Sequence, residues 1–474
     1  MQTECITDGM GFQPLEKREL CGVFQGGAIT SDAGGLLLRE VEARTAIIAR
    51  FAGCFTDHRN PELTEHTVYQ LVAQRVFGLA LGYEDLNDHD QLRHDPLLAI
   101  LAGKRDPTGQ DRLRPRDRGK ALAGKSTLNR LELSPPGADA RSRYKKITAD
   151  LGQMESLLTD FFIEAHPTPP ERIILDLDAT DDPLHGHQLG RFFQGYYREY
   201  CYLPLYIFSG EHLLCAQLRP ADQDGAAGSV AKLAGLVERI RRVWANVSIL
   251  VRADSGFCRE NLMSWCEAHG VDYVLGLAKN DRLRWEIDLE LELARAEFAA
   301  TGEPARRFKD FPYQTRESWS RERRVVGKAE HLAKGANARF VVTSLSPEEY
   351  EGRSLYEDVY CGRGEMENRI KEQQLMLFAD RTSAEDMRAN QIRLYFSSMA
   401  YVLLSAMRRM GLVGTSFERA QCNTIRLKLL KIGAWVRMTV RKIWVWFSES
   451  YPYREQFLEI LANIRGTPPV VLRC

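Results

Sequence analysis

The chain has 474 residues, 44% of them hydrophobic and 27% charged, which is typical of a folded globular protein with two to four domains. Its 64 Lys and Arg balance 64 Asp and Glu, so the net charge gives no information about a charged partner, which only the distribution of charge along the chain can give. Ten cysteines without a C-x-x-C pair exclude the usual zinc and redox spacings and favour reduced, mostly buried thiols. We expect neither a signal peptide nor a membrane span, because the first residues carry acids and no apolar run reaches about 18 residues.

Charge is unevenly distributed along the chain. Apolar positions at helical spacing predict helices within residues 28–102, whereas residues 103–146 are polar and rich in Pro, Gly and Arg, as in surface loops and short helices. Residues 104–146 hold thirteen Lys or Arg against five acids, and residues 401–448 hold nine against one. Single basic blocks are commonly solvated helix faces, but two of them favour contact with a phosphate backbone.

The stretch GKALAGKST, which begins at Gly119, matches the phosphate-binding loop of nucleotide triphosphatases. Such a loop needs a strand before it and a helix after it. The preceding DRLRPRDR cannot be a buried strand, so we expect Lys125 to open a helix with Ser126 or Thr127 as its cap. Basic residues of this helix, Lys125 and Arg130 among them, would then face nucleic acid.

From residue 171 onward the pattern predicts an α/β domain. Strands are expected over 171–180, 195–208 and 213–220, then a helix over 229–244, a strand over 247–257, a helix over 259–270 and a strand over 271–278. This is the order of an RNase H-like mixed sheet flanked by helices. Residues 281–355 are rich in charged residues and contain short segments with strand-like patterns, which predicts an inserted, mainly β subdomain. A helix is expected to resume over 363–378, and residues 401–474 are predicted to be helical and basic.

Acidic residues fall at the ends of two predicted strands. Asp176 and Asp178 in LDLDATDD share strand parity and therefore point to the same face. Asp254 follows a second apolar strand and precedes a glycine turn. Carboxylates at the ends of buried strands are costly to desolvate, although turn-capping Asp residues are a common alternative for each motif alone.

A third acid lies in the helix predicted over 363–378. Arg363, Glu367, Lys371 and Gln374 have the spacing i, i+4, i+8 and i+11, which places them on one helical face. A metal-bound phosphodiester site uses an acid flanked by cations in this way. A surface helix stabilised by ion pairs is the alternative for this segment alone.

Together these motifs resemble the DDE transposases of bacterial insertion sequences. The resemblance rests on LDLDATDDPLHGHQ, RADSGF and Y-x₂-R-x₃-E (Tyr360, Arg363, Glu367), and extends to YEDLNDHDQLRHDP and TLNRLE nearer the N-terminus. In the branch with Y-x₂-R-x₃-E-x₆-K, the last Lys falls on Gln374 of this chain. Lys371, one turn earlier, is the expected substitute.

The resemblance implies a cut-and-paste transposase that binds the inverted repeats of its element, cleaves their ends and joins them to target DNA. Asp178, Asp254 and Glu367 would hold two divalent metal ions. These would be Mg²⁺ or Mn²⁺, because oxygen ligands favour these ions over zinc. Asp176 is expected to orient a ligand without touching the ion, although Asp176 and Asp178 remain alternatives for the first ligand. The histidines of HGH (185–187) have no partner motif and are discounted as a zinc site.

Double-stranded DNA is the partner so implied, bound by a protein dimer, and the expected location is the bacterial cytoplasm in association with the nucleoid. Residues 1–150 would form a helical, basic region that binds DNA ends, 171–280 and 356–400 the catalytic core, 281–355 the β-rich insertion, and 401–474 a basic helical region. Contacts to phosphate are expected from Tyr360, Arg363, Lys371 and Gln374, and further DNA contacts from Lys125, Arg130, Arg437, Arg441 and Lys442. Trp435, Trp444 and Trp446 are expected to pack a core.

Two alternatives to an active transposase are compatible with the sequence. One is a nucleotide triphosphatase that uses Gly119 to Ser126. The other is a DNA-binding transposase relic without activity, for which Gln374 is the only indication in the sequence.

Overall fold

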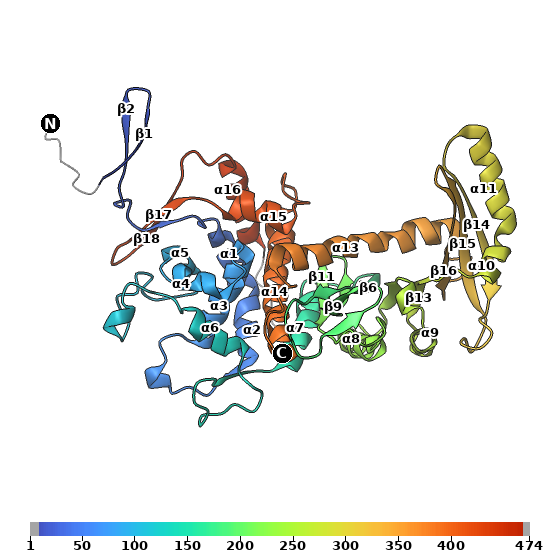
Figure 1. The fold of residues 1–474 in the computed structure, drawn as a ribbon, viewed down its shortest axis with the longest axis horizontal. Helices are drawn as coiled ribbons and strands as arrows, with labels where there is room; N and C mark the ends of the chain where they lie inside the picture. The colour runs from blue at the N-terminus through green and yellow to red at the C-terminus, as the bar shows by residue number, and fades with distance from the viewer. Residues whose placement is uncertain (1–8, 468–474) are drawn as a thin grey trace.

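The computed structural model of the chain describes residues 9–467. Figure 1 shows a helical body, built from both the N-terminal and the C-terminal parts of the chain, beside a long mixed sheet that carries α10 and α11 at its far end. A continuous helical segment that includes α13 runs along the sheet and joins the two parts. The chain is thus a mixed α/β protein, as the sequence predicts.

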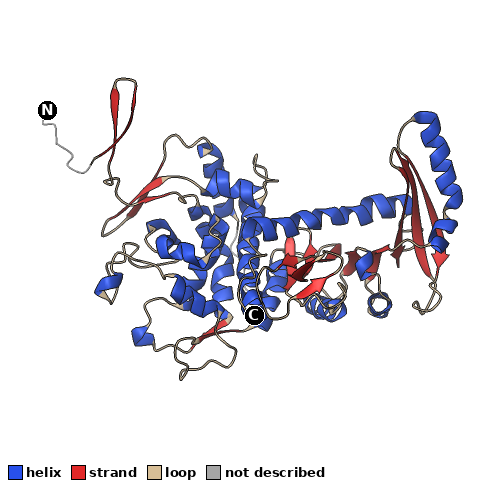
Figure 2. Ribbon diagram, in the orientation of Figure 1, coloured by secondary structure: helices blue, strands red, loops and turns tan. Residues whose placement is uncertain are grey.

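The large sheet has the strand order β11-β10-β6-β12-β13-β16-β15-β14. Strands β6, β10 and β11 are antiparallel neighbours, whereas β12 runs parallel to both β6 and β13. Figure 2 shows helices flanking this sheet. The strands are β6 (Arg172–Ala179), β10 (Leu205–Ser209), β11 (His212–Gln217), β12 (Ser248–Ala253), β13 (Asp272–Leu277), β14 (Ala305–Tyr313), β15 (Arg323–Leu332) and β16 (Gly335–Thr343).

Three helices flank the core strands: α7 (Leu151–Glu164), α8 (Ser229–Val243) and α9 (Glu260–Ala268). Helices α8 and α9 agree with the helices predicted over 229–244 and 259–270, whereas no helix was predicted at α7. The apolar stripe of α8 is buried at Leu233, Leu236, Val237 and Ile240, and it packs with the strands in one hydrophobic core. The single strand predicted over 195–208 is instead two, β9 (Glu199–Tyr202) and β10. Strand β9 pairs with β7 (Asp182–Pro183) and β8 (Phe192–Gln194) in a separate small sheet.

The insertion is β-rich only in its second half. Helices α10 (Asp281–Glu286) and α11 (Asp288–Thr301) come first, and β14, β15 and β16 then extend the large sheet from β13. Residues 281–301 are rich in Glu, Leu, Arg and Ala, which are strong helix formers. The insertion therefore lengthens the core sheet.

The helical body surrounds α14 (Met387–Met407), which is buried on nearly every face. Helix α14 packs against α1 (Gly35–Thr45), α2 (Ile47–Gly53) and α3 (Val68–Leu81), and also against β11. The remaining helices of this body include α5 (Pro96–Leu101), α6 (Lys125–Glu132), α15 (Cys422–Ile425) and α16 (Arg454–Gly466). Helix α14 thus connects the helical body to the sheet.

Two hairpins depart from the helical prediction for the ends of the chain. Strands β1 (Met10–Leu15) and β2 (Arg18–Gly22) form one, and β17 (Ala434–Met438) and β18 (Ile443–Phe447) form the other, with β3 (Ile29–Thr30) beside β17. The prediction that residues 401–474 are helical is therefore wrong at 434–447. There AWVRM and IWVWF alternate between two faces with β-branched and aromatic residues, which favours strands.

The described residues contain no helix long and apolar enough to cross a membrane. Eight cysteines lie within residues 9–467 and all are free thiols, most of them buried; Cys21 and Cys361 are exposed. The other two, Cys5 and Cys474, lie outside the described residues.

Candidate active site

The first pair of acids lies on β6, at the centre of the sheet. Asp176 is buried and paired with Arg252 of β12, whose Nε lies 2.7 Å from Oδ1 and whose Nη2 lies 2.8 Å from Oδ2. The two residues are direct neighbours in the parallel register of β6 and β12. Both carboxylate oxygens of Asp176 thus accept hydrogen bonds from the Arg252 guanidinium. Asp178, which lies nearer the end of the strand, forms no hydrogen bond with Arg252.

Asp254 follows β12 directly and caps a short 3₁₀ turn (Ser255–Phe257). Its Oδ1 accepts a hydrogen bond from the N–H of Gly256 at 2.9 Å. Since β6 and β12 are parallel neighbours, Asp178 and Asp254 emerge at the same edge of the sheet. Tyr360 packs closely against this edge. A side chain at Gly276 of β13 would collide with it, because a Cβ there would lie 2.6 Å from the Tyr360 hydroxyl and 2.9 Å from the Ser255 nitrogen. Gly276 therefore allows Tyr360 to approach the Asp254 turn.

The third acid comes from the helical segment that crosses this edge. Residues 355–360 are π-helical, 361–363 form a 3₁₀ turn and α13 (Gly364–Lys371) comes next. Arg363 lies between two carboxylates: Nη1 is 3.7 Å from Asp178 Oδ2, and Nη2 is 3.4 Å from Glu367 Oε1. Its guanidinium links the first and third acids of the predicted set.

Burial raises the pKa of Asp178 to about 6, and the negative charges of Asp254 and Glu367 contribute to that rise. Arg363 and the N–H of Ala179 act in the opposite direction. Burial also raises the pKa of the Tyr360 hydroxyl. Burial, together with the two neighbouring carboxylates, disfavours the ionised form of Asp178, and Arg363 offsets this only in part, so the site favours added positive charge.

The donor set suits a hard divalent cation, because it consists of carboxylate oxygens at the edge of a sheet. Within residues 9–467, however, no three His, Cys, Asp or Glu side chains are close enough together to enclose one ion. The Arg363 guanidinium lies between Asp178 and Glu367 instead. The three acids fit Mg²⁺ or Mn²⁺ in chemistry, and ion binding would require Arg363 to release Asp178 and Glu367.

The rest of the predicted helical face is not continuous. Residues Glu372–Met376 form a second π-helical turn, which rotates them relative to an α-helical register. Lys371 is exposed at the end of α13, whereas Gln374 donates from Nε2 to the carbonyl of Asp181 at 2.9 Å. Gln374 thus fixes the helix to the loop after β6.

Two residues at this edge were not selected from the sequence. Arg252 joins three elements, because its Nη1 also donates to the Val359 carbonyl at 2.6 Å. Tyr197 donates to the carbonyl of Ala179 at 3.2 Å, and its pKa is raised by burial and by nearby acids that include Asp178. The only indication of Arg252 in the sequence was its alternate position in the strand of VRADSGF. Once β6 and β12 are paired, this position places Arg252 on the same face of the sheet as Asp176.

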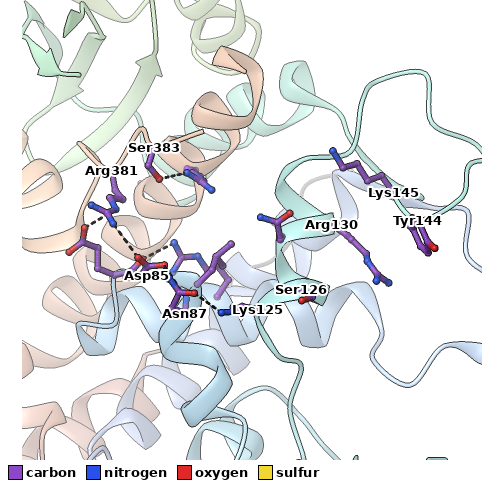
Figure 3. A pocket seen from close by; sticks show the side chains of 14 residues that line it. Asp85, Asn87, Lys125, Ser126, Arg130, Tyr144, Lys145, Arg381 and Ser383 are labelled. Atoms are coloured by element: carbon purple, nitrogen blue, oxygen red, sulfur yellow. Dashed lines mark hydrogen bonds and ion pairs between the residues drawn. The ribbon is translucent and has the colours of Figure 1, made fainter. Parts of the chain in front are cut away.

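A second, basic region surrounds α6 in the helical body (Figure 3). One cavity of about 510 Å³ and another of about 810 Å³ lie beside this helix, and Ser126, Arg130 and Tyr144 line both. Cations predominate in their walls: Arg59, Arg75, Arg93, Arg112, Arg114, Arg116, Lys120, Lys125, Arg130, Arg143, Lys145, Lys146, Arg381 and Arg393. Arg130 lies over the Tyr144 ring at 5.5 Å and has no carboxylate partner among the described residues.

The GKALAGKST stretch lacks the structure of a phosphate-binding loop. A 3₁₀ turn (Pro115–Asp117), not a strand, precedes Gly119. Helix α6 does begin at Lys125, but its N-cap is Gly124, so the expected cap by Ser126 or Thr127 is wrong. Lys125 Nζ donates to Asn87 Oδ1 at 3.0 Å and lies 3.4 Å from Asp90 Oδ2. The geometry that a triphosphatase requires is thus missing.

The predicted cations of residues 401–448 divide into two groups. Arg426 is buried and donates to the carbonyls of Leu79 and Ala80, so it fixes the fold. Arg437, Arg441 and Lys442 are exposed on the β17–β18 hairpin, not on a helix as expected. Trp435, Trp444 and Trp446 are 43%, 45% and 40% exposed, so the expectation that they pack a core is wrong.

A mixed sheet with two acids at one edge, and a crossing helix that adds a third acid and an arginine, defines a candidate phosphodiester-processing site. The chain belongs to the transposases with a DDE domain: the family model described as "Transposase DDE domain group 1" matches residues 12–469. The resemblance drawn from the three sequence motifs is thereby confirmed.

A comparison with curated proteins found no match. Among solved structures, the chain is similar to a chain in the cryo-EM structure of the piggyBac transposase synaptic complex with hairpin DNA. The identity is 13% and the TM-score 0.35, over 85% of this chain and 86% of that one. Family membership therefore rests on the family model.

Proposed function

We propose that this transposase cleaves the ends of its own element and joins them to target DNA at the edge formed by Asp178, Asp254 and Glu367. The observation that carries the proposal is the gathering of three carboxylates at the ends of adjacent strands and on the crossing helix, with the Arg363 guanidinium between two of them. The core would be RNase H-like, since β11-β10-β6-β12-β13 has the strand order and directions expected for that fold.

Asp178, Asp254 and Glu367 would hold two Mg²⁺ or Mn²⁺ ions. Bound ions of this kind activate water or a 3′-hydroxyl and stabilise the leaving oxygen. Arg363 would turn from the acids to a phosphate oxygen when DNA arrives, with Tyr360 and Lys371 as further phosphate contacts. Asp176 would act indirectly: it orients Arg252, which hydrogen-bonds to the Val359 carbonyl and so positions the helical segment that carries Arg363 at the edge of the sheet.

The divisions expected from the sequence extend this proposal to the whole chain. Residues 1–150 would bind the inverted repeats through the basic cavities beside α6, 171–280 and 356–400 would form the catalytic core, and 281–355 the insertion. Residues 401–474 would add cations on the hairpin. Two ends must be paired, so a dimer on DNA is part of the proposal.

The test is cleavage of a duplex that carries the inverted repeats flanking this reading frame. The full chain with Mg²⁺ should nick the repeat ends and join them to a second duplex, and EDTA should stop both reactions. A chain that binds the repeats but never cleaves them would be the inactive relic that Gln374 suggests. Tight ATP binding that depends on Lys125 would support the triphosphatase instead.

Metal binding should weaken in acid. The pKa of Asp178 is raised to about 6, so at pH 5 the carboxyl is mostly protonated and an ion must displace the proton. We expect Mn²⁺ affinity, measured by electron paramagnetic resonance, to fall roughly tenfold from pH 7.5 to 5. Affinity that stays constant across this range would exclude Asp178 as a ligand.

Arg130→Ala should weaken binding of the repeat duplex and lower the slope of log K against log salt by about one unit, because a free cation that contacts phosphate is lost. Lys125→Ala should have a smaller effect, because Asp90 already partly neutralises Lys125. Filter binding between 50 and 200 mM salt measures both. Arg295, exposed on α11, provides the control for loss of one surface charge; an equal slope change in Arg295→Ala would contradict the assignment.

A further inference from the structure

The β17–β18 hairpin has two chemically different faces. Ala434, Val445 and Phe447 point inward and belong to, or pack against, the core of the helical body, and Val436 is buried on the same face of the hairpin. The outward face carries Trp435, Arg437, Trp444 and Trp446, and Lys442 lies beside it; we call these five residues the tryptophan face. The alternation of a strand pair produces this separation.

Cross-strand register arranges the rings in a row. Trp435 is directly opposite Trp446, and their ring centroids are 4.6 Å apart with planes inclined by 23°. The planes of Trp444 and Trp446 are nearly parallel, inclined by 6° at a centroid distance of 6.0 Å. Gly27 supports one end of the row: it has φ +74°, and a Cβ there would lie 2.7 Å from the Trp435 Nε1. The rings are thus held in place while remaining 40–45% exposed.

The charged residues of the hairpin are all of one sign. Residues 434–447 contain Arg437, Arg441 and Lys442 and no acid. Arg437 is opposite Trp444 in the register, and Lys442 Nζ lies 5.4 Å from the Trp444 ring centroid. None of the three cations forms an ion pair within the part of the chain that the structure describes. Three unpaired cations beside exposed rings match an anionic ligand with flat, apolar groups.

We propose that the tryptophan face binds unpaired nucleotides of DNA, with bases stacked on the indole rings and phosphates held by Arg437, Arg441 and Lys442. Exposed aromatic rings bind bases in this way without sequence preference, and cations follow the backbone. In an intact duplex the base faces are already stacked, so the face selects single strands. The choice of DNA as ligand rests on the proposed function, whereas the site lies on a different element from the acids.

The experiment titrates the full chain with a fluorescein-labelled dT₁₅ strand and, separately, with a blunt 15-bp duplex, following both anisotropy and tryptophan emission. The single strand should quench emission and bind the wild type more tightly than a duplex lacking the repeats. Trp444→Ala and Trp446→Ala should each weaken single-strand binding by about five- to a hundredfold. Trp285→Ala, which removes a 76% exposed tryptophan from α10, should leave it unchanged.

Melting temperatures guard against misfolding. If an alanine variant is unstable, Trp446→Tyr should retain most of the affinity because it keeps a stacking ring, and Arg437→Glu should lose affinity with the rings intact. Equal single-strand binding by all of these variants would overturn the inference. So would a change of sedimentation from dimer to monomer in Trp446→Ala, which would assign the face to a second copy of the chain.

The two proposals fail separately. A wild type that cleaves repeat duplexes with Mg²⁺ but neither binds dT₁₅ nor shows quenching leaves the proposed function standing and overturns this inference. Single-strand binding that the tryptophan variants abolish supports the inference even where no cleavage is found.

Discussion

Asp178→Asn is expected to abolish metal-dependent cleavage and strand transfer, with a loss of at least about a thousandfold in rate. An amide oxygen in place of the carboxylate removes one negative ligand from ions that each stabilise several kcal/mol of charge in the transition state. Asp254→Asn and Glu367→Gln should behave alike. Binding of the repeat duplex should persist in all three, because the basic cavities beside α6 lie in the helical body.

The measurement is end cleavage on a denaturing gel, with duplex binding recorded on the same preparations. Glu365→Gln is the matched control: it removes an exposed acid from α13 two residues before Glu367, and it should cleave normally. Asp176→Asn should be milder than Asp178→Asn, since an amide can still accept from Arg252. If Asp176→Asn were inactive and Asp178→Asn active, the first ligand would have been misassigned by two residues.

The edge of the sheet could be predicted from the sequence because it depends on local patterns. Strand parity placed Asp176 and Asp178 on one face, and a strand with a glycine turn after it identified Asp254. The partner of Asp176 could not be found this way. Arg252 is 76 residues distant, and only the parallel register of β6 and β12 makes it a neighbour.

Helical periodicity places Arg363 and Glu367 one turn apart, as they are in the structure, but it fails for the residues after Lys371. A π-helical turn over Glu372–Met376 breaks the period of 3.6, so Gln374 contacts the loop after β6. For the C-terminal region, the basic composition predicted an anionic partner. The helix expected there was wrong, because residues 434–447 form a β-hairpin. Counting cations does not separate a helix from a hairpin, whereas the alternation of AWVRM and IWVWF does.

Arg252→Ala is expected to have the largest effect on stability, about 3–5 kcal/mol in the free energy of unfolding. It would leave the Asp176 carboxylate buried without its guanidinium partner and would remove the hydrogen bond to the Val359 carbonyl. Urea denaturation of the wild type and the variant at pH 7 measures the difference. Arg242→Ala is the control, because its ion pair with Glu238 is exposed on both sides and should be worth less than about 1 kcal/mol.

The dependence on pH separates loss of charge pairing from loss of packing. Burial already raises the pKa of Asp176, and removing Arg252 raises it further, so the folded variant holds a proton that the unfolded chain releases. Stability of Arg252→Ala should therefore be greatest at pH values below the unfolded pKa of about 4 and should fall as pH rises through the raised folded value. The double change Asp176→Leu with Arg252→Met should recover much of the loss, because two apolar side chains of similar volume need no partner. A deficit in Arg252→Ala that is independent of pH, and that the double variant does not reduce, would mean that Arg252 acts by filling space.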